Sequence, residues 1–409
     1  MGNKKSIWFL YLVAFAVVAG YTLFSPLLPF LIAKLGGDSS QFGLVIALAP
    51  LTTVLFSPLM GALTDRWGRQ PVILLGMAGM AVWFGLFALA TSMTYLYIGA
   101  LIGGIFSAGA MAAATAYVAD VTTEDERAGY ITRLQAAQMF GAFLPPLVGG
   151  FLASGNIKLP FFIMAGISLL ALVLCFFFVK ESLSKEMRDK TNADGKTVLG
   201  IVGSSWARQF GYLKMMVGPA LVIAFAIALP TGFFETTLPL HIKDVGLTTS
   251  QSGIIFSAGT FAIMIAMVLF VEKFVKKFGE LTSIIIGMVA AVIFYVVLPF
   301  LTGFWFLLVV NLILSLTTAQ IRPANITLVT KYAPPTEQGL SQSAYNLYTS
   351  IGRIIGPILG GILYGSIGAK ITLAIAAGIF VISTIYTASI KKYRKTPEPK
   401  IITADTTSI

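Results

Sequence analysis

The chain has 409 residues, of which 57% are hydrophobic and 11% are charged, whereas a typical water-soluble domain has about 25% charged residues. With a mean hydropathy of +0.87, this composition excludes an ordinary globular protein of the aqueous phase. The net charge of +11 could suggest a nucleic-acid partner, but the basic residues are scattered through short loops rather than gathered on one domain, so we expect none.

Twelve apolar segments of about 20 residues follow in chain order, and each is long enough at 1.5 Å per residue to cross roughly 30 Å of hydrocarbon. They lie near residues 7–33, 42–64, 71–91, 95–118, 129–153, 160–180, 216–242, 250–271, 281–300, 304–330, 339–366 and 370–390. The sequence therefore predicts an all-α membrane protein with 12 transmembrane helices in two pseudo-symmetric six-helix bundles, surrounded by the lipid bilayer.

Changes in composition divide the chain into four parts. We expect an N-terminal six-helix bundle over residues 1–180 and a C-terminal six-helix bundle over residues 215–391. Residues 181–214, rich in Lys, Glu, Asp and Ser, form a linker that is expected to contain a short amphipathic helix around residues 198–213. The tail, residues 392–409, has no apolar periodicity and is predicted to be disordered.

The distribution of lysine and arginine predicts the orientation in the membrane. Most of the 28 basic residues lie at the termini or in loops of one parity, and only Lys34, Lys158, Lys243 and Lys370 lie on the other side. The positive-inside rule therefore places both termini and the linker in the cytoplasm. The single cysteine, Cys175, lies in the sixth span, which excludes an internal disulfide and a cysteine-based metal cluster.

Two elements rich in glycine and proline repeat at an offset of 211 residues. GAFLPPLVGG at residues 141–150 matches GRIIGPILGG at residues 352–361, and the same offset carries residues 65–69 onto residues 276–280. An offset kept over such a distance argues for two homologous halves. The glycines and prolines of the two elements are Gly141, Pro145, Pro146, Gly149, Gly150, Gly352, Gly356, Pro357, Gly360 and Gly361.

The spacing within these elements has a physical meaning. Glycines spaced by four thin one face of a helix, so that a neighbouring helix can approach closely. Pro357 adds a kink, because its missing N–H leaves a carbonyl group free one turn earlier. Ordinary close packing of helices explains the pattern as well as a specialised role does.

The loop after the second span combines glycines with charges. Gly61 and Gly68 allow a tight turn, and Asp65 could either cap a helix or pair with Arg69. Asp120, at the end of the fourth span, is a further candidate partner. We interpret the cluster as a conformational latch, whose members are Gly61, Asp65, Arg66, Gly68, Arg69 and Asp120. The alternative is a solvated charge run, because surface ion pairs contribute only about 0–1 kcal/mol.

These motifs resemble those of a known family. GALTDRWGRQ at residues 61–70 closely resembles the loop between helices 2 and 3 of the major facilitator superfamily. The repeated glycine and proline elements resemble the antiporter motif of its drug:proton antiporters, which those proteins carry in helix 5. Here the intact copy lies in the eleventh span, and the copy in the fifth span has Pro145 where the pattern has glycine.

Two shorter segments resemble the NorA-type multidrug exporters of Gram-positive bacteria. They are FET at residues 234–236 in the seventh span and IRPA at residues 321–324 in the tenth. The resemblance implies a monomeric transporter of the bacterial cytoplasmic membrane that exports drugs in exchange for protons and contributes to antibiotic resistance. It implies no cofactor and no metal.

Glu235 is the acidic residue that lies well within a predicted span. A charged side chain at the bilayer centre costs at least about 2.5–3.5 kcal/mol, so it indicates function by default. Burial disfavours the charged carboxylate and a nearby arginine favours it, which is the balance that a proton carrier needs. We predict that Glu235 is the protonation site; a structural carboxylate neutralised by a fixed arginine is the alternative.

Depth in the membrane distinguishes two partners for Glu235, which lies roughly 9 Å outside the middle of its span. Arg322 lies about five residues to the cytoplasmic side of the middle of the tenth span, whereas Arg353 lies near the middle of the eleventh and is the nearer candidate. A cavity holding both arginines and one carboxylate is net positive, which favours anionic or zwitterionic cargo.

Polar and aromatic residues at helical spacing predict the wall of a cavity, because polar faces must turn away from lipid. The predicted substrate-binding residues are Tyr21, Phe24, Gln135, Gln138, Phe234, Asn325, Gln342, Tyr345 and Thr349. For each aromatic residue taken singly, packing in the protein core is the commoner role.

Departures from the family pattern leave alternatives open. Ala319 stands where NorA-type exporters carry a second acid, and Ala100 stands where the antiporters carry an arginine. A dedicated exporter of an endogenous anion, such as a siderophore or a lipid-like metabolite, therefore remains an alternative to a multidrug exporter. A membrane-embedded enzyme is the remote alternative, since the sequence has no HExxH motif, no Walker-type phosphate loop and no plausible His or Cys nucleophile arrangement.

Overall fold

The computed structural model describes residues 3–193, 198–334 and 337–390, so the predicted disorder of residues 392–409 lies outside the described part. Six long helices form the first half of the chain: α1 (Ile7–Lys34), α2 (Ser39–Trp67), α3 (Arg69–Leu89), α4 (Met93–Val121), α5 (Glu124–Gly155) and α6 (Leu159–Phe178). Two linker helices follow, α7 (Lys185–Ala193) and α8 (Val198–Gly211), and α8 agrees with the amphipathic helix expected from the sequence.

The second half contains six further membrane-spanning units. Two of these units each consist of two helices, α10 (Thr249–Ala266) with α11 (Glu272–Phe278) and α13 (Phe304–Thr318) with α14 (Ile321–Tyr332). A π-helical turn, Met267–Val271, joins the first of these pairs. The remaining helices are α9 (Gly218–Asp244), α12 (Glu280–Val297) and α15 (Gln338–Ile390).

Within the described residues, eleven helices are long and apolar enough to cross a membrane. The last of them, α15, has 53 residues and breaks at Gly368, where φ is +77°. That angle lies in the left-handed region, which glycine enters without the steric cost that a Cβ atom brings. The break separates the two final spans predicted from the sequence, and the chain is therefore an all-α membrane protein with twelve spans.

Both halves begin their second helix in the same way. The Asp38 carboxylate accepts a hydrogen bond from the backbone N–H of Gln41 at 2.8 Å, and the Thr248 hydroxyl accepts one from Gln251 N–H at 3.3 Å. In each case the glutamine side chain bonds back to the capping residue, which completes a capping box. The two caps are 210 residues apart, so the repeat seen in the sequence extends to local backbone structure.

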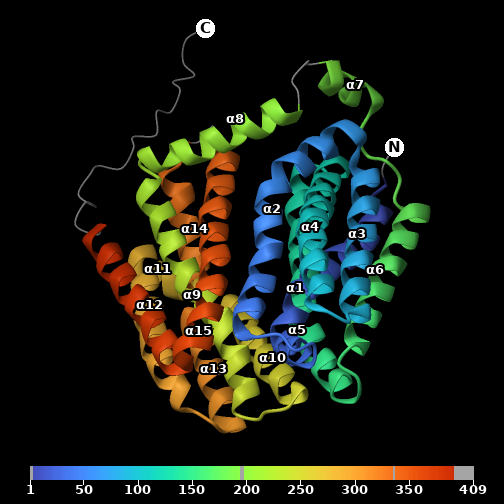
Figure 1. Cartoon of the computed structure of the whole chain (residues 1–409). Helices are drawn as coiled ribbons and strands as arrows, with labels where there is room; N and C mark the ends of the chain where they lie inside the picture. Colours follow the sequence, from blue (N-terminus) through green and yellow to red (C-terminus); the bar gives the residue numbers. More distant parts are fainter. Residues whose placement is uncertain (1–2, 194–197, 335–336, 391–409) are drawn as a thin grey trace.

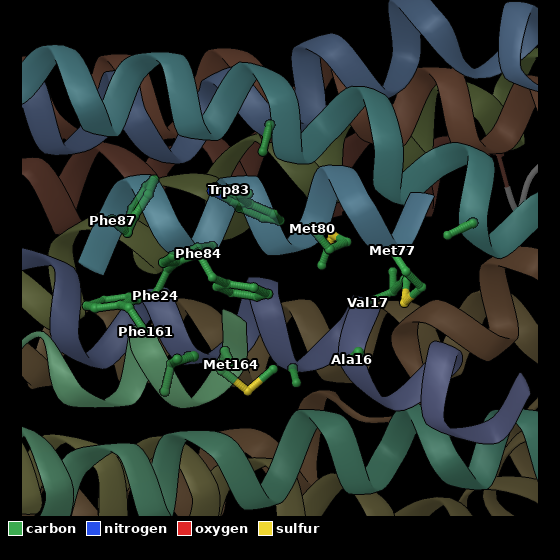
Figure 2. Packing of buried hydrophobic residues seen from close by; sticks show 14 of the residues in the cluster. Ala16, Val17, Phe24, Met77, Met80, Trp83, Phe84, Phe87, Phe161 and Met164 are labelled. Carbon is green, nitrogen blue, oxygen red and sulfur yellow. The ribbon is translucent and has the colours of Figure 1, made fainter. Parts of the chain in front are cut away.

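Each half has its own apolar core. In the first half, aromatic rings from α1, α3 and α6 stack together, and Figure 2 shows this cluster around Phe24, Trp83, Phe84, Phe87 and Phe161. The second half repeats part of it, because the Phe234 ring stacks on Tyr295 with centroids 5.0 Å apart. Such rings contribute large buried areas, and the phenylalanines among them do so without a polar group that needs a partner.

The two halves lie side by side, and α7 and α8 lie at one end, which we call the linker end (Figure 1). At the opposite end, the far end, α2 packs on α15 and α5 packs on α10. Serine side chains of α10 also donate across this boundary: Ser252 bonds to the Pro26 carbonyl at 3.1 Å and Ser257 to the Phe143 carbonyl at 2.8 Å. The halves are therefore joined directly at the far end.

Glycines make the far-end contact closer than other residues allow. A Cβ atom at Gly43 of α2 would lie 2.2 Å from the Pro357 carbonyl oxygen, and one at Gly253 of α10 would lie 2.2 Å from that of Pro146. Gly43 also faces Gly361, just as Gly253 faces Gly150. The two crossings are equivalent under the internal repeat, and we call them the glycine crossings.

Candidate functional site

A cavity of about 750 Å³ lies between the halves. The walls come from α2 and α4 on one side and from α9, α13, α14 and α15 on the other, and two residues of α8 complete the lining at the linker end. Because the glycine crossings join the halves at the far end, the cavity faces the linker end. Its polar and charged lining residues are Thr53, Ser57, Gln209, Thr231, Glu235, Thr318, Arg322, Asn325, Ser343, Tyr345, Asn346, Thr349, Ser350 and Arg353.

An ion pair lies on the cavity wall between α9 and α15. The Nη2 atom of Arg353 is 3.0 Å from Oε1 and 3.2 Å from Oε2 of Glu235, so one guanidinium nitrogen donates to both carboxylate oxygens. The Arg353 side chain is 47% exposed and that of Glu235 is 28% exposed. The partner that the depth estimate favoured is therefore the one that Glu235 contacts, and the pair remains accessible from the cavity.

Arg322 occupies another part of the same wall. It lies on α14, lines the cavity together with Tyr345, and has no described carboxylate within ion-pairing distance. With Glu235 and Arg353 paired, the charged groups of the lining leave one excess positive charge. The cavity thus presents one carboxyl group, paired with an arginine, and at another point a second arginine that can attract an anionic group.

The intact glycine and proline element positions the ion pair. A Cβ atom at Gly352 would lie 2.7 Å from the Leu229 nitrogen, and one at Gly356 would lie 2.4 Å from the Leu229 carbonyl oxygen. The thinned face of α15 therefore packs directly on the backbone of α9. This close approach brings Arg353, which follows Gly352, within reach of Glu235.

The degenerate copy packs in the equivalent way in the first half. Gly141 of α5 lies against α1, because a Cβ atom there would be 2.5 Å from the Phe15 carbonyl oxygen. Gly149 meets the Leu23 side chain, and Pro145 and Pro146 are buried. Each copy thus packs on the first helix of its own half and, at its last glycine, on the other half.

Three of the predicted substrate-binding residues line the cavity, namely Asn325, Tyr345 and Thr349. Two more are hydrogen-bonded to lining residues. The Tyr21 hydroxyl bonds to the cavity residue Thr53 at 3.0 Å, and the Gln342 amide donates to Asn346 at 3.5 Å. Helical spacing therefore located the polar face of α15 correctly.

The other four predicted residues lie elsewhere. Gln135 and Gln138 of α5 are outside the lining, and the Gln138 amide contacts the Met111 sulfur at 3.4 Å. Phe24 is 5% exposed within the aromatic cluster of the first half, and Phe234 stacks on Tyr295. Both phenylalanines belong to packed clusters rather than to the cavity wall, because these faces of α1 and α9 contact aromatic rings of their own halves.

Sequence reasoning missed several lining residues. Thr53 and Ser57 of α2 are one turn apart in an apolar run, so helical spacing could have identified them. Trp206 and Gln209 come from the linker helix α8, and no pattern in the sequence indicates that a connecting segment reaches the cavity.

The latch cluster is closed within the first half. The Arg69 guanidinium contacts Asp65 at 2.7 Å and Asp120 at 3.0 Å, and it donates to the Thr64 carbonyl at 2.8 Å. Both predicted partners of Arg69 are therefore present. Arg66 lies in the last turn of α2. Gly61 needs correction, because it lies inside α2 and not in a turn, and a Cβ atom there would meet nothing within 4 Å.

A residue that the sequence did not indicate completes this cluster. The Glu181 carboxylate accepts hydrogen bonds from the backbone N–H groups of Arg69 at 2.9 Å and Gln70 at 3.2 Å, at the positive N-terminus of α3. Gly68 makes room for it: φ is +112°, and a Cβ atom would lie 2.2 Å from a Glu181 oxygen. Gly68 therefore has a backbone conformation that favours glycine, as expected for the tight turn predicted there.

The second half carries the same contact with the charges reversed. Glu280 and Lys331 lie 4.0 Å apart, and they correspond to Arg69 and Asp120 at the repeat offset of 211 residues. The Lys331 side chain is 59% exposed, so this pair is looser and better solvated than its counterpart.

Comparisons with known proteins agree with this architecture. The family model described as Major Facilitator Superfamily matches residues 10–271 and 220–407. "Multidrug resistance protein 2" of Bacillus subtilis (strain 168) is 31% identical over 369 residues, which cover 88% of this chain and 90% of that protein. "Quinolone resistance protein NorA" of Staphylococcus aureus (strain MSSA476) is 26% identical, with 93% of this chain and 96% of that protein covered.

Among solved structures, a bacterial homologue of the human lysosomal transporter Spinster, in an inward-facing and occupied conformation, superposes with a TM-score of 0.73. The two chains are 15% identical, and the match covers 95% of this chain and 96% of the other. At this identity the likeness concerns the fold alone.

Proposed function

The chain belongs to the Major Facilitator Superfamily, whose members move small molecules across membranes, and from this premise we propose that it is a proton-coupled exporter of drugs or other amphiphilic molecules. We place it in a cell membrane as a monomer, with both termini and the linker end in the cytoplasm. The names of its multidrug-resistance relatives support this cargo class. The observation that carries the proposal is the Glu235–Arg353 ion pair on the cavity wall.

The conformation suits one step of an exchange cycle. The cavity faces the linker end, so cargo from the cytoplasm can enter it while Glu235 is ionised and paired. After the halves rock to expose the cavity outside, a proton neutralises Glu235 and frees Arg353. Return to the linker-end-open state then releases the proton to the cytoplasm and restores the pair. One carboxyl group thereby couples proton entry to cargo exit.

Uptake into proteoliposomes or everted vesicles with an imposed inside-acid gradient tests the proposal, with ethidium as the cargo. We expect accumulation by the wild type and its loss in Glu235→Gln, because the amide can neither bind nor release the proton. Glu272→Gln is the matched control, since that carboxylate is 75% exposed and lies outside the cavity. Gradient-dependent accumulation that persists in Glu235→Gln would contradict the assigned coupling site.

The excess positive charge of the cavity favours a second candidate, a dedicated exporter of one anionic metabolite. The same vesicles distinguish the two functions when ethidium is replaced by an anionic amphiphile. Saturable transport of the anion without any response to ethidium would assign the anion-specific function. Transport of ethidium that requires the gradient would assign the multidrug function.

A further inference from the structure

The linker helix α8 lies across the open end of the cavity. It contacts α2 of the first half and α15 of the second, and Figure 1 shows it passing over the space between them. The chain just after α8 is held to the second half, because the Tyr212 hydroxyl donates to the Glu337 carboxylate beside the start of α15. Cargo that enters from the linker end must therefore pass next to α8.

One face of α8 takes part in the cavity itself. Trp206 and Gln209 are three residues apart, and both belong to the lining. The Trp206 ring stacks against Phe210 with centroids 6.0 Å apart, and the Phe210 ring meets Tyr348 of α15 edge-on at 6.3 Å. This chain of aromatic contacts connects the half-buried indole to the second half and restricts its orientation.

We propose that α8 supplies a ring-binding subsite at the mouth of the cavity, in which the Trp206 indole takes the planar aromatic part of the cargo. The inference deepens the proposed export function and depends on it for the route of the cargo. Aromatic stacking suits a multidrug site, because every aromatic ring has a π face and the contact needs no fixed pattern of hydrogen bonds. A cationic ring adds attraction to the indole face.

Binding to the purified full-length protein in lipid nanodiscs, without any gradient, tests the subsite. Calorimetric titrations compare ethidium, a planar aromatic cation, with dodecyltrimethylammonium, an alkyl cation. We expect Trp206→Ala to raise the ethidium Kd about five- to tenfold and to change the alkyl Kd less than about twofold. Trp206→Phe should recover most of the ethidium affinity. Trp305→Ala is the matched control, since Trp305 of α13 is 72% exposed and lies outside the lining.

Fluorescence adds a readout that a purely structural role of α8 would not change. A ring stacked on Trp206 should quench its emission, so part of the quenching by ethidium should disappear in Trp206→Phe and remain in Trp305→Phe. Equal Kd changes for both cations would overturn the subsite and leave α8 with a purely structural role. Unchanged binding in Trp206→Ala would overturn it too, as would wild-type protein that binds no ring-bearing cation or anion.

The two proposals fail in different ways. Ethidium binding with the Trp206 signature but without gradient-driven transport would reject proton-coupled export and retain the subsite. Gradient-driven transport with unchanged ethidium affinity in Trp206→Ala would reject the subsite and retain the exporter.

Discussion

Arg69 shows how much one side chain can connect at the linker end. Its side chain is 10% exposed, and it joins the end of α2, the start of α3 and the end of α4 through Asp65, Thr64 and Asp120. The pair with Asp120, whose side chain is 21% exposed, is costly to break from one side only, because the remaining charge loses its ionic partner; Asp65 is 59% exposed and is better solvated. The latch cluster therefore also stabilises the first half.

Replacing Arg69 tests that role. We expect Arg69→Ala to lower the free energy of unfolding by about 1–3 kcal/mol, since it leaves the Thr64 carbonyl without its donor and the Asp120 carboxylate with the Ser182 hydroxyl alone. Thermal unfolding of the purified protein in one detergent measures the effect. Lys276→Ala, which removes a 76% exposed partner of Glu272, should change stability by less than about 0.5 kcal/mol. Similar losses in the two variants would mean that the cluster is only a solvated charge run.

At the scale of elements, the glycine crossings hold the far end closed by direct contact of backbones. Neither crossing uses a charged group, and both rely on the absence of a Cβ atom at Gly43 and Gly253. Interfaces of this kind tolerate little added side-chain volume, because closely packed groups cannot shift without moving a whole helix. A larger side chain at a glycine crossing should therefore favour a conformation in which the far end is open.

Gly253→Ala should shift the protein toward a far-end-open state, because the new methyl group would lie 2.2 Å from the Pro146 carbonyl oxygen. Distances between spin labels at the far ends of α5 and α10 measure the shift. We expect the population of molecules with the longer distance to grow. Gly85→Ala in α3 is the control, since a Cβ atom there meets nothing within 4 Å. Unchanged distances in Gly253→Ala would show that the crossing yields without opening.

The break in α15 gives a second prediction at this scale. Gly368→Ala should destabilise the protein by about 1–2 kcal/mol, because φ at this position is +77° and an L side chain is strained there. Gly378→Ala, ten residues later in the same element with open space around it, should be neutral or mildly stabilising. Unfolding midpoints of the two variants check this, and equal midpoints would mean that the chain relieves the strain.

Elements were easier to predict from the sequence than the direction in which they face. The sixth span was expected over residues 160–180 and is observed as Leu159–Phe178, because length and apolar character alone define a span. The facing of Phe24 and Phe234 could not be derived in this way. In lipid, the outer and the inner surfaces of a helix are both apolar, so hydrophobic periodicity does not distinguish them.

Long-range contacts limit in a similar way which site residues can be predicted from the sequence. Depth made Arg353 the nearer candidate partner of Glu235, since buried charges require partners, but only the structure decides between Arg353 and Arg322. Glu181 could not be predicted as a cap of α3, because it lies 112 residues from Arg69 in the sequence and belongs to a hydrophilic connection. Trp206 could not be predicted for the same reason, because its place in the cavity depends on how the linker crosses between the halves.

For the whole molecule, the charge balance of the cavity should decide which cargo it prefers. Arg322→Gln removes the excess positive charge, so we expect the Kd of an anionic amphiphile to rise about tenfold and that of ethidium to fall. Titration of the purified protein measures both values. Lys331→Gln removes a 59% exposed positive charge outside the lining and should leave both unchanged. Parallel changes for anion and cation would show that Arg322 acts on shape rather than on charge.

The reversed ion pair of Glu280 and Lys331 bears on how the two halves diverged. If both descend from one ancestral unit, they began with the same pair, and reversing it took at least two substitutions. Two direct substitutions pass through an intermediate that carries like charges side by side. In the second half solvent reaches Lys331, which is 59% exposed and can turn away from a like charge, whereas Arg69 is 10% exposed and cannot, so such an intermediate costs more in the first half. The first half therefore has less freedom to exchange these two charges than the second half.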